Sequence, residues 1–172
     1  KLLGGVVGLV EGLVYSFLLL FIASVVNTTT MYVNQMKYGS LILEKKEYVY
    51  IKRILNISGY VGDHEIQRSL KKFTEELKTA HIVDEEEMPT DVVRMNSIVT
   101  VASDNKWEKT IQIVQPSEKD IKNDKVSILA PMGAALFGYS VGDVVKWEFP
   151  TGEIEIKVID VKQQVQEKNL IY

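Results

Sequence analysis

The side chains best suited to covalent or redox chemistry are scarce in this sequence. Cysteine is absent, and the two histidines are His64 and His81. The absence of cysteine excludes disulfides, thiolate zinc sites and cysteine nucleophiles, and two histidines argue against a histidine-rich metal site. We therefore expect no catalytic residue, no metal site and no cofactor, and we expect that the protein is not an enzyme.

One motif has the pattern of a hydrolase nucleophile. Residues 138–142 fit G-x-S-x-G, in which a serine stands on a sharp turn between a strand and a helix. That chemistry requires a strand before Ser140, a helix after it and a partner histidine. Here the pattern predicts a short helix before the serine and a strand after it, and no histidine follows. We interpret the motif as a glycine-rich turn that ends at Asp143.

Two carboxylates, Asp63 and Glu65, directly follow a break rich in turn-forming residues. Aspartate is a preferred N-cap residue, and acidic side chains suit the positive end of a helix. We interpret both residues first as helix-capping residues.

A third candidate site is an apolar corner at residues 129–133, where a strand is followed by a short helix. The proline suits the first turn of this helix and Gly138 suits its end. A corner of this kind can offer a small hydrophobic contact surface to another protein. Its residues are Leu129, Ala130, Pro131, Met132 and Gly133.

The composition is that of a folded protein. The chain has 172 residues, of which 46% are hydrophobic and 25% charged, and its formal net charge is −3. This length suits one domain or two small ones. The mildly acidic balance argues against direct, sequence-specific nucleic-acid binding, which needs a basic face.

Residues 1–30 differ from the rest of the chain. The segment 2–26 is apolar with the single charge of Glu11, and it is long enough to cross a bilayer as a helix. Three interpretations stay open: a membrane anchor, a leader translated from upstream of Met31, and a buried helix. Basic residues follow the segment, so an anchor would leave the remaining chain in the cytoplasm, where we expect the protein to act.

Residues 31–84 have the pattern of a helical hairpin. Tyr48, Ile51 and Leu55 mark one apolar face before the break at residues 58–62. A second face follows the seam spacing of a coiled coil. We expect a short antiparallel coiled coil, which either packs on a neighbouring domain or projects as an arm. The residues of the second face are Ile66, Leu70, Phe73, Leu77 and Ala80.

An acidic stretch, residues 85–91, is expected to be a solvated linker, and residues 92–165 are rich in strand-forming segments. The expected strands lie at 92–93, 98–101, 111–114, 126–129, 144–149 and 154–161, with one short helix after Pro131. This predicts an α+β fold, with an antiparallel sheet and one helix. Residues 166–172 form the tail.

The sequence at 86–97, EEMPTDVVRMNS, and that at 126–138, VSILAPMGAALFG, resemble two signatures of the Gre transcript-cleavage factor family, and within it the Rnk type. This resemblance implies an FKBP-like C-terminal domain behind an N-terminal coiled coil. It also implies bacterial RNA polymerase as the partner. The domain would dock at the rim of the secondary channel through residues 129–133.

Cleavage-competent members of this family carry acidic residues at the coiled-coil tip, which Asp63 and Glu65 loosely match. The arm expected here is short, so we expect polymerase binding without stimulation of cleavage. The alternatives are a cleavage-stimulating factor that uses these two carboxylates, a membrane-tethered interaction module, and a peptidyl-prolyl isomerase suggested by the FKBP-like fold alone.

Overall fold

The structure of the chain is a computed structural model that describes residues 14–20, 36–58, 63–103, 107–149 and 152–164. Residues 14–20 form a helix within the unit Lys1–Gln35, which is separate from the compact unit Met36–Tyr172. Among the described residues, no helix has both the length and the apolar character that crossing a bilayer requires. The rest of the apolar leader and the tail 166–172 lie outside the described residues.

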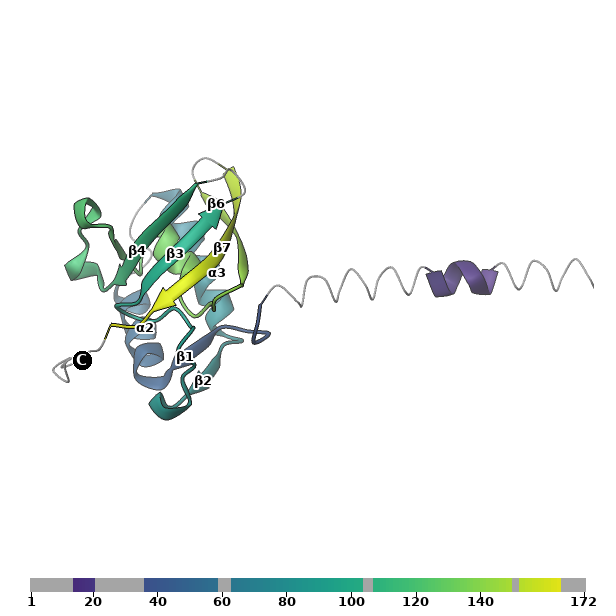
Figure 1. Ribbon diagram of the computed structural model, residues 1–172, viewed down its shortest axis with the longest axis horizontal. Coiled ribbons are helices and arrows are strands. Elements are labelled where there is room, and N and C mark those ends of the chain that lie inside the picture. Colours follow the sequence, from purple (N-terminus) through teal and green to yellow (C-terminus); the bar gives the residue numbers. More distant parts are fainter. Residues whose placement is uncertain (1–13, 21–35, 59–62, 104–106, 150–151, 165–172) are drawn as a thin grey trace, which may run out of the picture. The chain divides into compact units, whose positions relative to one another are not determined.

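A five-stranded, curled sheet forms the centre of the larger unit (Figure 1). Its strand order is β5-β4-β3-β7-β6, and all neighbouring strands are antiparallel except the parallel pair β4 and β5. The mixed α+β class is therefore confirmed, with one parallel pair that the sequence pattern did not predict. The strands are β3 (Ile98–Ser103), β4 (Glu108–Val114), β5 (Lys125–Ser127), β6 (Val144–Phe149) and β7 (Gly152–Lys162).

Alternation of apolar residues explains which face of the sheet is buried. Along β3 the residues alternate between buried and half-buried positions, and Val99 and Val101 are completely buried. On the neighbouring strand β7, Ile156 and Val158 are also buried. Successive strand residues point to opposite faces, so this spacing places the valines and isoleucines together in the core.

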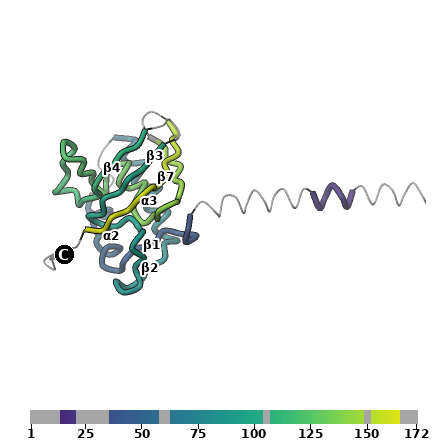
Figure 2. Tube along the Cα trace, in the orientation of Figure 1, coloured from purple at the N-terminus to yellow at the C-terminus, as the bar shows by residue number. Residues whose placement is uncertain are grey.

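Two helices and a small second sheet precede the large sheet. Helix α2 spans Lys45–Ser58 and helix α3 spans His64–Leu77, which confirms the two helices expected from the sequence. Strands β1 (Ile42–Glu44) and β2 (His81–Val83), which the sequence pattern did not predict, pair in parallel. Figure 2 shows β1 and β2 side by side, below the large sheet in this view.

The apolar face of α3 packs on the C-terminal part of the chain. Leu70, Phe73 and Leu77 are buried, and the rings of Phe73 and Phe137 meet edge to face with centroids 6.3 Å apart. One turn before Phe73 on the same buried face, Ser69 Oγ accepts a hydrogen bond of 3.2 Å from the indole Nε1 of Trp147. The expectation of a coiled coil is not confirmed, because the α3 seam joins the core shared with the sheet.

The short helix α4, Pro131–Leu136, is buried on the side that faces the sheet and α3. Proline stands in its first turn, and Gly138 follows its end with a φ of +82°. Both positions match the expectation, because a proline needs no N–H donor there and glycine tolerates a positive φ. In this way α4 and the corner before it are held between the sheet and α3.

Candidate protein-docking site

The corner at residues 129–133 is ordered by hydrogen bonds to the strand before it. The amide of Ala130 donates to the Ser127 carbonyl at 2.9 Å, and the amide of Leu129 donates to Ser127 Oγ at 3.1 Å. These bonds fix the turn between β5 and α4. As a result, Leu129, Ala130, Pro131 and Met132 form a half-buried apolar surface.

Gly133, which we predicted as a docking residue together with the other four, is buried. A Cβ atom at this position would lie 2.1 Å from the Ser127 carbonyl oxygen and 3.0 Å from Ile128 Cα. Glycine therefore permits the close approach of α4 to the β5 backbone. Gly133 therefore packs in the interior. The accessible part of the corner is residues 129–132.

The two predicted tip carboxylates lie at the beginning of α3. Asp63 is the N-cap, and its Oδ1 accepts a hydrogen bond of 2.9 Å from the amide of Ile66. Glu65 is exposed in the first turn, where its charge is favourable beside the helix N-terminus. The capping interpretation of Asp63 is confirmed. The preceding residues 59–62 lie outside the described part of the chain.

The described residues hold no group of three or more histidine, cysteine, aspartate or glutamate side chains placed to bind a metal ion. Asp63 and Glu65 open α3, whereas the corner opens α4, so the two predicted sites belong to different elements. Two carboxylates alone form an incomplete site for a divalent cation, which takes six or more oxygen ligands. Among the described residues, these two carboxylates would need water or groups from a partner to complete such a shell.

Ser140 lies in a turn, as the sequence analysis predicted. Its hydroxyl and its amide both donate to Asp143 Oδ2, each at 2.8 Å, and both residues are buried. The segment follows α4 and precedes β6, the reverse of the order that a nucleophile elbow requires. The serine hydroxyl is therefore used to close the turn, and Gly142 adopts a positive φ of +94° within it.

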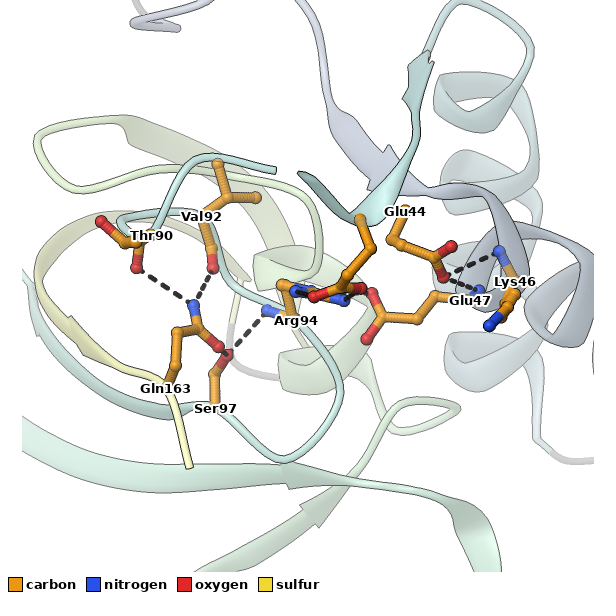
Figure 3. Close-up of polar contacts among 9 residues, drawn as sticks. Glu44, Lys46, Glu47, Thr90, Val92, Arg94, Ser97 and Gln163 are labelled. Atoms are coloured by element: carbon orange, nitrogen blue, oxygen red, sulfur yellow. Dashed lines mark hydrogen bonds and ion pairs between the residues drawn. The ribbon is translucent and has the colours of Figure 1, made fainter. Parts of the chain in front are cut away.

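A network around Arg94 was not predicted (Figure 3). The Arg94 guanidinium donates two hydrogen bonds to Glu85, at 2.8 and 2.6 Å, and its Nε lies 3.4 Å from Glu47 Oε2. Only 17% of the Arg94 side chain and 3% of the Glu47 side chain are exposed. The network joins α2 to the segment leading into β3. Glu85 is exposed, as expected of a solvated segment, and an arginine nine residues later also pairs with it.

The electrostatics of this network differ between its two carboxylates. Burial raises the pKa of Glu47 to about 7, although the neighbouring Arg94 opposes the rise. Hydrogen bonds from Arg94 lower the pKa of the exposed Glu85. Glu47 Oε1 is buried and has no hydrogen-bond partner among the described residues. Glu47 therefore loses its proton only near neutral pH.

Further hydrogen bonds fasten the same segment to the end of β7. The side-chain amide of Gln163 donates to the carbonyls of Val92, at 2.7 Å, and Thr90, at 3.2 Å, and its oxygen accepts from Ser97 Oγ at 2.8 Å (Figure 3). The Ser97 hydroxyl oxygen in turn accepts from the Arg94 amide at 2.9 Å. No sequence pattern predicts the contacts of Gln163, because they join residues about seventy positions apart.

Comparisons with known proteins match the C-terminal part of the chain to a family of transcription elongation factors. Residues 88–163 match the family model described as "Transcription elongation factor, GreA/GreB, C-term". The chain is 38% identical over 91 residues to the regulator of nucleoside diphosphate kinase of Escherichia coli K12, covering 52% of this chain and 67% of that protein. It is 32% identical over 97 residues to the transcription elongation factor GreA of Christiangramia forsetii, covering 56% of this chain and 61% of that protein.

A solved structure is similar over a larger share of the chain. It is described as a prokaryotic transcription elongation factor GreA/GreB from Nitrosomonas europaea, with 28% identity and a TM-score of 0.58. The match covers 72% of this chain and 98% of that one. The similarity thus extends beyond the C-terminal sheet into the segment that contains α2 and α3.

Proposed function

Because this chain belongs to the GreA/GreB family of transcription elongation factors, we propose that it is a Gre/Rnk-type regulator that binds bacterial RNA polymerase. The alignments span 61% and 67% of two curated relatives, so the activity of the whole protein is part of the proposal. The observation that carries it is the family match at residues 88–163, which includes the whole apolar corner.

The proposed docking surface is the half-buried part of the corner, Leu129, Ala130, Pro131 and Met132. Its backbone is fixed by the bonds to Ser127, so a partner would find the surface already ordered. Preorganisation lowers the entropic cost of association. We place this contact at the rim of the polymerase secondary channel, in the cytoplasm, without sequence-specific contacts to nucleic acid.

We further propose that binding occurs without stimulation of transcript cleavage and that the protein is not itself an enzyme. Asp63 uses a carboxylate oxygen to cap α3. The helix has 14 residues, so at about 1.5 Å per residue it is only about 21 Å long. Its apolar face is also held against the sheet domain. These features support an arm too short to carry the carboxylates deep into a channel.

The FKBP-like assignment of the sheet domain is part of the same proposal. A curled five-stranded sheet packed on the short helix α4 supports it. The fold alone does not imply prolyl isomerase activity. Turnover of a proline-containing peptide by the full chain would contradict the non-enzymatic part of the proposal.

The first experiment measures binding of the full chain to bacterial core RNA polymerase, with a GreA protein added as competitor. We expect binding that GreA displaces, and loss of binding in Met132→Asp. The matched control is Ile121→Asp, because Ile121 is a 68% exposed apolar residue of the same domain outside the corner. If both variants bind as the wild type does, the corner is not the docking surface.

A second experiment adds the protein to backtracked elongation complexes. The expected result is an unchanged transcript length, alongside reduced cleavage when GreA is present at a competing concentration. Shortened transcripts that disappear in Asp63→Asn would establish the cleavage-stimulating alternative instead.

A further inference from the structure

The solvent face of α2 is basic and contains no acidic side chain. Lys45, Lys46 and Arg53 are exposed on it, and Val49 stands between them with 62% of its surface exposed. Successive helical residues are about 100° apart, so these four positions share one face, opposite the buried Ile51. Both glutamates next to this helix face, at positions 44 and 47, are buried.

An exposed acidic turn follows β2. Residues 85–87 form a single 3₁₀ turn of three glutamates, preceded by Asp84. Glu85 is engaged by Arg94, whereas Glu86 and Glu87 are exposed and no ion pair is recorded for either among the described residues. Glu86 and Glu87 therefore present negative charge that no ion pair within the described part of the chain neutralises.

The basic face and the acidic turn lie side by side. Because β1 and β2 are parallel neighbours, the segments that follow them, α2 and the acidic turn, leave the small sheet together. The Lys45 ammonium lies 4.0 Å from Asp84 Oδ1, and both side chains are about 70% exposed, at 71% and 69%. Adjacent patches of opposite charge thus form one surface, here called the α2–turn surface.

We propose that the α2–turn surface is self-complementary and docks a second copy of this chain through a two-fold axis. In a two-fold interface the same surface is used by both copies, so each basic face meets the acidic turn of the other. The exposed Val49 supplies an apolar contact beside these charges. The contact is electrostatic in origin, and we expect it to weaken as salt screens it.

The arrangement favours a second copy over a polyanion such as RNA. A polyanion would be attracted by the three cations of α2 but repelled by the exposed carboxylates beside them. A second copy pairs with both the basic face of α2 and the acidic turn at once. The proposal goes beyond polymerase binding, and the surface shares no residue with the corner at 129–132.

A charge swap in the full chain tests the proposal. One variant carries Lys45→Glu and Lys46→Glu, and the other carries Glu86→Lys and Glu87→Lys. The mass of each protein in solution is measured by sedimentation, alone and mixed, at low and high salt. An equal swap at Lys119→Glu and Lys122→Glu, two exposed residues outside the surface, is the matched control.

We expect the wild type and the control to dimerise, with a dissociation constant that rises at least about tenfold from about 0.05 M to about 0.5 M salt. Each swapped variant alone should be monomeric, and the mixture of the two should form a heterodimer, because both contacts again join opposite charges. A monomeric wild type, or swapped variants that dimerise alone as strongly as the wild type, would overturn the proposal. The proposal would also be overturned if the swapped variants dimerised as the wild type does and lost only their affinity for RNA.

Discussion

Replacing Glu47 by glutamine tests the electrostatic account of the Arg94 network. Burial raises the pKa of Glu47 from 4.5 to about 7 in the folded protein. The folded state therefore holds this proton more tightly than the unfolded state does. The contribution of protonated Glu47 to the free energy of unfolding is fully present below about pH 4.5, and it is lost as the pH rises to about 7.

The size of the effect follows from the same values. A rise in pKa from 4.5 to about 7 corresponds to about 3 kcal/mol, at about 1.4 kcal/mol per pH unit. Glutamine keeps an oxygen that can accept from Arg94 but cannot ionise. Glu47→Gln should thus gain up to about 3 kcal/mol relative to the wild type between about pH 5 and about pH 8.

The assay is urea unfolding of both proteins at several pH values across this range. Other titrating groups, such as Glu76, whose pKa burial also raises, affect both proteins equally and cancel in the difference. Asn56→Gln is the control, because Asn56 is an exposed residue of the same helix and neither side chain can ionise, so this variant should differ from the wild type by the same amount at every pH. A difference for Glu47→Gln that is the same at both ends of the range would refute the reasoning.

Three other substitutions have defined outcomes. Gly133→Ala places a Cβ 2.1 Å from a backbone oxygen and should cost about 1–3 kcal/mol in a denaturation curve, whereas a neutral result would mean that α4 can shift freely. Asp63→Ala removes the α3 N-cap and should cost about 1 kcal/mol, with polymerase binding retained. Phe73→Ala empties a buried site against Phe137 and should lower unfolding free energy by about 3–5 kcal/mol, and a loss below about 1 kcal/mol would show that α3 is not fastened there.

The elements that the sequence predicted well are those with a strong local pattern. The alternation from Ile154 to Val158 predicted β7, and the spacing of Leu70, Phe73 and Leu77 predicted the buried face of α3. The same spacing did not predict what this face contacts. An apolar seam packs equally well on a second helix or on a sheet, so only tertiary packing decides between them.

The contacts that escaped prediction depend on long-range pairing. Strands β1 and β2 have three residues each and pair across the whole helical segment, so neither carries enough residues to show a period. The ion pair of the exposed Glu85 escaped prediction because its partner, Arg94, comes later in a different segment. At the corner, the residue types predicted an apolar surface, but only the Ser127 carbonyl explains why Gly133 belongs to its interior.

The parallel pairing of β1 and β2 has a consequence for how this fold can change. The segment carrying α2 and α3 leaves the small sheet after Glu44 and rejoins it at His81, which pairs with Ile42 at the other end of the three-residue strand β1. Segments with adjacent ends can be lengthened or exchanged without altering the path of the chain elsewhere. The two short strands are therefore the points at which the helical segment joins the sheet domain, and only a replacement that keeps the apolar face of α3 would leave the shared core intact.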